Sequence, residues 1–344
     1  MNGHPPESES EHFSPYRQDG KLYGFVCIVT GATQPVGRAI VTELATHGAA
    51  CIYACSSPGD DSAGQLAEEV QKVSPSTKVI GYPFGLASEE ETLGLIDDVL
   101  NTWGRLDVYV TSSGLLGPSS ITETTPADLY KLFEANSMAP FFALKYAPPA
   151  MAKTTPKGSY PNAAPKDRAY GSIVVVSSVA STYGGCWGAG YTMTCHAALG
   201  VVRAGVATLK GTGVRINCIS PGQIDIGVDL KGFDMRGLSA QFPPSSLQSG
   251  EGRKEIVGLE RAGVPGEVGR VAGFLASSFS PVSIVYKLGV NNTVLAIYVQ
   301  HLSSIYVGVT IVNIQESGLS ANDLKSTPRA ISPLHTLPST QSTT

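Results

Sequence analysis

One stretch near the start of the chain has the pattern of a phosphate-binding turn between a strand and a helix. The turn Thr30-Gly31-Ala32-Thr33-Gln34-Pro35-Val36-Gly37 follows an apolar run from Phe25 to Val29, and Val36, Ile40 and Leu44 then recur every four residues. This pattern predicts a strand, a tight turn and a helix. The first N–H groups of that helix and its dipole favour a phosphate, so the expected ligand is the pyrophosphate of a dinucleotide.

A second predicted strand, Cys51 to Cys55, ends where a dinucleotide-binding fold usually carries an acid for the adenosine ribose. Cys55 occupies that position, and Ser56 and Ser57 follow it. Small hydroxyl donors suit the 2′-phosphate of NADP(H), so the sequence favours NADP(H) over NAD(H). The alternative is that both serines only begin the loop SSPGDDS.

Helices and strands alternate along the chain, as they do around a parallel sheet. The predicted strands after the first two are residues 78–82, 105–110, 172–176 and 214–219. The predicted helices after the first are residues 65–73, 88–103, 129–151 and 267–277, together with a helix that carries Tyr191 and His196 and is completed by residues 199–209. These strands and helices must position the candidate catalytic and cofactor-binding side chains described below.

Composition fits an α/β enzyme, because 42% of the 344 residues are hydrophobic and only 15% are charged. A net charge of -4 argues against a nucleic-acid partner. The six cysteines form no C-x-x-C pair, which favours a reducing, cytoplasmic location. We expect no membrane partner, because no signal-peptide core and no run of eighteen uncharged apolar residues appear.

The chain is expected to hold one domain with an extension at each end. Residues 1–20 are polar and acidic and predict a disordered arm. Residues 21–319 form the expected dinucleotide-binding and catalytic domain. Residues 320–344 are rich in Ser, Thr and Pro and predict a disordered tail.

Five motifs, taken together and in order, resemble the short-chain dehydrogenase/reductase family. They are TGATQPVG, GRLDVYVTSSG, SSVAS, Tyr191 and SPGQID, and the resemblance covers about Leu22 to Gly318. It implies a doubly wound parallel sheet, the Rossmann fold, with helices on both faces in three α/β/α layers. It also implies a nicotinamide dinucleotide, reversible hydride transfer between a carbonyl and an alcohol, and assembly as a homodimer or homotetramer.

The resemblance assigns catalytic roles to three residues. Ser178 and Tyr191, thirteen residues apart, match the family's serine and tyrosine. The serine would hold the substrate carbonyl oxygen, and the tyrosine would give or take the proton. Asn136 matches the helix asparagine that anchors a water-mediated proton relay. Pro140 has no N–H for the Asn136 carbonyl, which either leaves that carbonyl for the relay or only kinks the helix.

The residues expected to hold the cofactor come from the Gly-rich turn, the strand ends and the later Pro-Gly turn. They are Thr30, Gly31, Val36, Gly37, Ser56, Ser112, Gly114, Asn136, Tyr191, Pro221, Gly222 and Ile224. The resemblance implies that Ile224 offers backbone groups to the nicotinamide carboxamide. No metal site is expected.

A tyrosine with an ordinary pKa of about 10 needs a nearby cation to ionise at neutral pH. In the family a lysine four residues after the tyrosine supplies that cation, and here the position is Cys195. A second alignment places His196 at the lysine but Thr192 at the tyrosine. We prefer the first alignment, since it keeps the serine spacing. Tyr191 and His196, five residues apart, are poorly placed to share a helix face.

Other positions also depart from the family pattern. Pro35 replaces the middle glycine of the turn, Gly85 replaces an aspartate, TSSG replaces N-N-A-G, and Ile226 replaces a threonine. At the first position of a helix, proline removes an N–H that has no intrahelical acceptor, so the fold should tolerate Pro35. Adenosine recognition is expected to be weakened.

Two later segments bear on the substrate and the fold. Residues 227–250 resemble the family's mobile substrate lid, and their apolar side chains indicate a medium-sized, largely apolar substrate of the kind found in secondary metabolism. Those side chains could equally pack on the domain edge. Residues 281–302 interrupt the match, which resumes at Ser303, and are expected to be an insertion.

Two functions follow from these observations. The first is an oxidoreductase that transfers a hydride between NADP(H), or less favourably NAD(H), and a carbonyl or alcohol on a medium-sized, largely apolar substrate. The second is a catalytically impaired binding or accessory protein of the same fold. Pro35, Cys55, Gly85 and Cys195 all depart from the family pattern, which favours the second.

Overall fold

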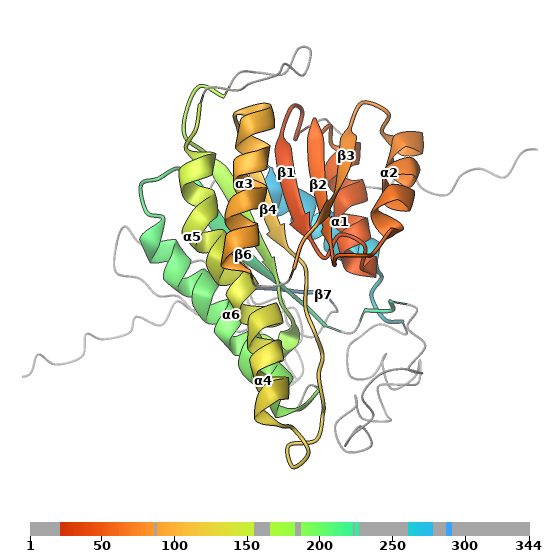
Figure 1. The fold of residues 1–344 in the computed structure, drawn as a ribbon, viewed down its shortest axis with the longest axis vertical. Helices are drawn as coiled ribbons and strands as arrows, with labels where there is room; N and C mark the ends of the chain where they lie inside the picture. The colour runs from red at the N-terminus through yellow and green to blue at the C-terminus, as the bar shows by residue number, and fades with distance from the viewer. Residues whose placement is uncertain are drawn as a thin grey trace, which may run out of the picture. The chain divides into compact units, whose positions relative to one another are not determined.

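The computed structural model describes residues 21–85, 88–154, 166–182, 187–222, 224–226, 261–277 and 287–290 (Figure 1). All of them belong to one unit of the chain, residues 1–311. The predicted N-terminal arm, the lid at 227–250, the residues from Ser303 at which the family match resumes, and the tail lie outside the described residues. Within the described part, no helix has the length and apolar character needed to cross a membrane.

A seven-stranded parallel sheet forms the centre of the fold, in the order β3-β2-β1-β4-β5-β6-β7. The strands are β1 (Val26–Thr30), β2 (Cys51–Ser56), β3 (Lys78–Pro83), β4 (Val108–Thr111), β5 (Gly171–Val176), β6 (Val214–Pro221) and β7 (Lys287–Val290). Their order reverses between β1 and β4, where a doubly wound sheet opens a crevice at its carboxyl edge. The predicted doubly wound α/β fold is confirmed.

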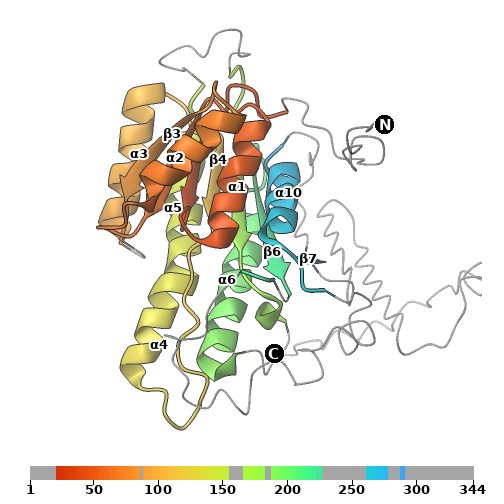
Figure 2. The ribbon, with the colours of Figure 1, turned by 90° about the vertical axis from the view of Figure 1, so that its right-hand side faces the viewer.

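Helices cover both faces of this sheet and make three layers. One face carries α1 (Pro35–Thr46), α2 (Ser62–Val73) and α10 (Pro265–Ala276), and Figure 2 shows α1 beside α10. The other face carries α3 (Glu89–Trp103), α5 (Ala139–Met151) and α6 (Gly188–Thr208). The β1 strand is buried throughout, with Val26 and Ile28 in one core layer and Cys27 and Val29 in the other. Burial on both faces explains its continuous apolar run.

One long helical segment approaches the crevice and contains a wide turn. It joins α4 (Pro126–Phe133), a π-helix at Glu134–Met138, and α5, in good agreement with the predicted helix at 129–151. Pro140 lies four residues after Asn136 and has no N–H to give to its carbonyl. A π-turn lengthens the hydrogen-bond register by one residue, and such turns are frequent at functional sites. The wide turn thus includes Asn136.

Residues from the expected insertion take part in the sheet. The backbone of β7 pairs in parallel with β6, from Cys218 opposite Lys287 to Pro221 opposite Val290. These four residues lie within 281–302, so this segment supplies the edge strand of the described sheet.

A buried ionic network ties the amino ends of the central strands together. The Asp107 carboxylate accepts hydrogen bonds from the Val26 amide at 2.8 Å and from Arg105 Nε at 2.8 Å. Lys166 Nζ lies 3.2 Å from the same carboxylate, and both side chains are fully buried. Because Lys166 precedes β5, one carboxylate joins segments beside β1, β4 and β5.

We expect Asp107→Asn to destabilise the fold by about 3–5 kcal/mol, because Arg105 and Lys166 would keep buried charges without a balancing carboxylate. Urea unfolding followed by circular dichroism measures this loss. Asp98→Asn is the matched control, since the exposed Asp98 carboxylate accepts only a surface hydrogen bond from the Tyr82 hydroxyl among the contacts described. Equal losses in the two variants would contradict the proposed importance of the network.

Candidate active site

The Gly-rich turn joins β1 to α1 as predicted, and it requires its two outer glycines. Gly31 has a φ of 63°, in the left-handed region that favours glycine. A Cβ on Gly37 would lie 2.0 Å from the Gly31 carbonyl oxygen, so no larger residue fits there. Pro35 is the first residue of α1, as predicted, where its missing N–H costs no helical hydrogen bond. The next amides of the helix still lack intrahelical acceptors and face the crevice end of β1.

The loop after β4 packs against this turn. Thr30 Oγ1 lies 3.0 Å from Ser113 Oγ and accepts a hydrogen bond from the Ser112 amide at 3.3 Å. A Cβ on Gly31 would lie 2.9 Å from the Ser113 Cα. The sequence TSSG, which departs from the family pattern, therefore keeps close contact with the turn through hydroxyl groups.

A cavity of about 220 Å³ lies at the carboxyl ends of β1, β4, β5 and β6. Eight of the predicted site residues line it together: Val36, Ser112, Gly114, Asn136, Ser178, Tyr191, Pro221 and Gly222. Thr30, Gly31 and Gly37 are not among the lining residues, and the close contacts around both glycines shape the turn. Ser56 and Ile224 are not in the wall: Ser56 is buried at the end of β2, and Ile224 pairs with Gly263.

Ser178 lies between β5 and the short 3-10 helix Val179–Ser181. Its side-chain oxygen accepts a hydrogen bond from the Ala180 amide at 3.2 Å, which fixes the direction of the hydroxyl. The O–H proton can still be donated to a ligand oxygen in the cavity. This arrangement suits the carbonyl-holding role that the sequence assigns to Ser178.

Tyr191 and Cys195 lie four residues apart on α6, and both line the cavity. Cys195 is only 3% exposed. His196, in contrast, is exposed on the outer side of the helix, with Nδ1 2.9 Å from the Thr192 carbonyl oxygen. The structure therefore brings together the residues of the preferred alignment and leaves His196 outside. Among the described residues, the position that carries lysine in the family is occupied by the Cys195 thiol.

The Asn136 side chain joins three segments of the site. Its Oδ1 accepts a hydrogen bond from the Leu115 amide at 2.8 Å, and Nδ2 donates to the Leu115 carbonyl at 2.9 Å. Nδ2 also donates to Thr194 Oγ1 at 3.0 Å. Because the side chain is occupied in this way, any proton relay at Asn136 would use its backbone carbonyl, to which Pro140 offers no N–H.

Two residues that the sequence did not single out also position the site. Thr194 is fully buried, and its Oγ1 lies 3.0 Å from the Tyr191 carbonyl oxygen, so it links Asn136 to the tyrosine helix. Trp187, at the start of α6, has a φ of 57° and donates from Nε1 to the Gly117 carbonyl at 3.2 Å. A positive φ is a rare and strained backbone conformation for a bulky residue, and such strain is more frequent near functional sites. Neither the Thr194 contact nor the Trp187 contact can be recognised from the local sequence.

A parallel sheet that reverses its strand order beside a Gly-rich turn, with hydroxyl side chains at the carboxyl edge, defines a nucleotide-binding α/β protein. Residues 25–234 match the family model described as short chain dehydrogenase. The chain belongs to the short-chain dehydrogenase family, and the resemblance seen in the motifs is confirmed.

Known proteins agree with this assignment. The chain is 29% identical over 263 residues to L-rhamnose-1-dehydrogenase of Scheffersomyces stipitis, covering 76% of this chain and 92% of that protein. It is 32% identical over 213 residues to sex determination protein tasselseed-2 of Zea mays, covering 60% of this chain but only 56% of that protein. A solved 7α-hydroxysteroid dehydrogenase, complexed with NADH and 7-oxo glycochenodeoxycholic acid, shares the fold. Its TM-score is 0.64 and its identity 23%, with 80% of this chain and 96% of that chain covered.

Proposed function

We propose that this protein is an oxidoreductase that moves a hydride between a nicotinamide dinucleotide and a carbonyl or alcohol of a small molecule. One observation carries the proposal: Ser178, Tyr191 and the Asn136 turn meet around one cavity next to the Gly-rich turn. The name of the Scheffersomyces relative indicates oxidation of a sugar, and the steroid dehydrogenase structure holds NADH with an oxo ligand. Both support redox chemistry at a carbonyl.

The described residues fit a nicotinamide dinucleotide. The start of α1 offers backbone amides and a helix dipole to a pyrophosphate. Gly31 and Gly37 keep the turn free of side chains that would block close approach. Ser112 Oγ is buried in the cavity wall and has no hydrogen-bond partner among the described residues, which suits a bound hydroxyl or amide group. When bound, the nicotinamide would supply or accept the hydride.

The side chains of the cavity would handle the substrate oxygen and its proton. The Ser178 hydroxyl would donate a hydrogen bond to the carbonyl oxygen and hold it near Tyr191. The tyrosine hydroxyl would then donate its proton to the oxygen as an alcohol forms, or receive it in the reverse direction. Cys195 supplies no cation to favour the phenolate, whereas a protonated tyrosine can still donate to a forming alkoxide. We therefore propose that reduction is faster than oxidation at neutral pH.

Apolar side chains in the cavity wall support a medium-sized, largely apolar substrate. Leu115 is 44% exposed and Ile226 is 38% exposed, and both face the cavity together with Leu116 and Val176. Such a surface binds hydrocarbon parts of a substrate, while Ser178 orients the polar group. We propose a substrate of this class, as in secondary metabolism.

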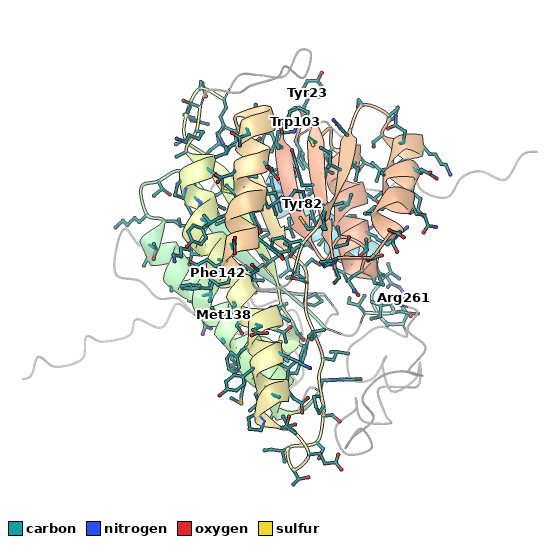
Figure 3. The ribbon with its side chains drawn as sticks, viewed as in Figure 1. Tyr23, Tyr82, Trp103, Met138, Phe142 and Arg261 are labelled. Atoms are coloured by element: carbon teal, nitrogen blue, oxygen red, sulfur yellow. The ribbon has the colours of Figure 1, made fainter. Side chains whose placement is uncertain are left out.

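We also propose that the protein is a cytoplasmic homodimer or homotetramer. The five cysteines of the described part are free thiols, which suits a reducing compartment. The long helical segment and α6 expose Tyr130, Met138, Phe141 and Met193, whereas Phe142 is buried; Figure 3 labels Met138 and Phe142. Covering these exposed side chains with a second copy would remove apolar surface from water.

A second function is favoured by one observation, the Cys195 thiol at the position where the family carries lysine beside its tyrosine. Under this alternative the protein binds the dinucleotide and lacks turnover. It would then serve as a binding or accessory subunit.

Fluorescence titration with NADH and NADPH, followed by a panel of carbonyl substrates, tests the two functions. We expect dinucleotide binding together with slow reduction of at least some apolar carbonyls, because a protonated tyrosine can still donate. Dinucleotide binding without any turnover would support the accessory function instead of the oxidoreductase. Failure to bind either dinucleotide would contradict both.

A further inference from the structure

The Asp60 carboxylate connects the loop between β2 and α2 to the Gly-rich turn through a hydrogen bond. Asp60 Oδ2 accepts a hydrogen bond from Thr33 Oγ1 at 2.7 Å, across 27 residues of sequence. Asp60 Oδ1 accepts a second one from the Ser62 amide at 3.0 Å. A carboxylate has about four acceptor positions, so oxygen lone pairs remain for a ligand.

The end of β2 itself offers nothing to a ribose. Cys55 is fully buried, and burial raises the pKa of its thiol well above the ordinary value, so it remains neutral. Ser56 is 6% exposed, and its hydroxyl lies 3.5 Å from the Asp60 carbonyl oxygen as a weak donor. Ser56, one of the two serines on which the predicted NADP(H) preference rests, is therefore turned into the fold, whereas Ser57 is exposed. Asp60 is hydrogen-bonded to Thr33 of the turn that would hold the pyrophosphate.

The Asp60 carboxylate carries a negative charge beside the Gly-rich turn. Hydrogen bonds from Ser62 and Thr33 hold the pKa of Asp60 below its ordinary value, so it is ionised at neutral pH. Arg38 also contributes to that lowering, but its guanidinium pairs with Glu69 at 2.5 Å. Asp61 adds a further carboxylate beside Asp60. A 2′-phosphate beside Asp60 would be repelled by its carboxylate, and the guanidinium of Arg38 is already paired with Glu69.

We propose that Asp60 binds the adenosine ribose hydroxyls in place of the acid missing at Cys55, and that it makes the protein prefer NAD(H) over NADP(H). This inference rests on the proposed dinucleotide function and names the cofactor. In dinucleotide-binding folds the ribose acid follows the Gly-rich turn by about 20 residues, a spacing that both Cys55 and Asp60 satisfy. Of these two residues, only Asp60 is an acid. The carboxylate accepts both ribose hydroxyls and repels a 2′-phosphate.

Asp60→Asn tests the proposal with little disturbance of the loop. The amide oxygen can still accept from the Ser62 amide, and the amide nitrogen can donate to Thr33, so the substitution removes mainly the charge. We expect the wild-type protein to bind NADH at least about tenfold more tightly than NADPH, a difference of about 1.4 kcal/mol. In the variant this ratio should fall to near one. Fluorescence titration of the full chain with each nucleotide measures it.

Asp61→Asn is the matched control, because it removes the same charge one residue away and the Asp61 side chain makes no cap hydrogen bond to α2. We expect that variant to keep most of the wild-type ratio. Tighter binding of NADPH by the wild-type protein, or an equal change of the ratio in both variants, would overturn the inference while leaving the dinucleotide function intact. Failure of the wild-type protein to bind either nucleotide would overturn both.

Discussion

Tyr191→Phe is expected to lower turnover by about 10²–10⁴-fold while leaving dinucleotide binding intact, because the hydroxyl is the proton donor in the proposed reaction. Tyr191 and Ser178 both line the cavity, together with residues 34–36 of the Gly-rich turn. Phenylalanine keeps the ring and its packing, so the loss should appear in kcat at saturating nucleotide. Initial rates with one carbonyl substrate, measured together with fluorescence titration, separate chemistry from binding.

His196→Ala is the control for this experiment, since His196 is exposed and bonded to its own helix. It should retain the wild-type rate. If His196→Ala abolished turnover and Tyr191→Phe did not, the alignment that places His196 at the lysine position would be the correct one.

Cys195→Lys is expected to raise activity at neutral pH and to move the pH optimum of alcohol oxidation downward. A cation about 4 Å from the tyrosine oxygen is worth roughly 4 kcal/mol at an effective dielectric of 20, an upper bound of about three pKa units. A positive charge favours the phenolate and so lowers the tyrosine pKa. The phenolate that oxidation requires would then form at lower pH. Rates of oxidation and reduction between pH 6 and about pH 10 would show the shift.

Cys195→Met is the neutral control, because methionine extends into the cavity without a charge. Its pH optimum should stay at the wild-type value. Identical profiles for the Lys and Met variants would show that position 195 does not govern the ionisation of Tyr191. If none of the proteins turned over a carbonyl while the wild type bound nucleotide, the accessory function would be favoured.

Local patterns predicted the strands and helices well, because each buried element carries its periodicity in its own residues. The run from Phe25 to Val29 predicts a strand, and the ladder of β1 covers Val26–Thr30. The strand predicted from Arg105 begins its ladder only at Val108, after the side chains that form the buried network. The edge strand β7 was not predicted, because the family pattern resumes only at Ser303 and residues 281–302 were expected to be an insertion.

The candidate site was less predictable, because its contacts join residues that are distant in sequence. Asn136 and Thr194 are 58 residues apart, and Thr33 and Asp60 are 27 apart. Motif spacing placed Ser178 and Tyr191 at one cavity, since both follow fixed positions after β5. No local pattern indicates that a loop carboxylate would reach the Gly-rich turn, and only the packing of β1 beside β2 brings them together.

The buried network around Asp107 and the cavity lie at opposite ends of the same parallel strands. Strand pairing at the amino edge is therefore held by charges that take no part in the proposed chemistry. Substitutions at the carboxyl edge, such as the proline in the turn or the thiol on α6, can accumulate without weakening that anchor. We therefore expect residues at the cavity to be replaceable with little loss of folding stability, whereas residues of the Asp107 network are not.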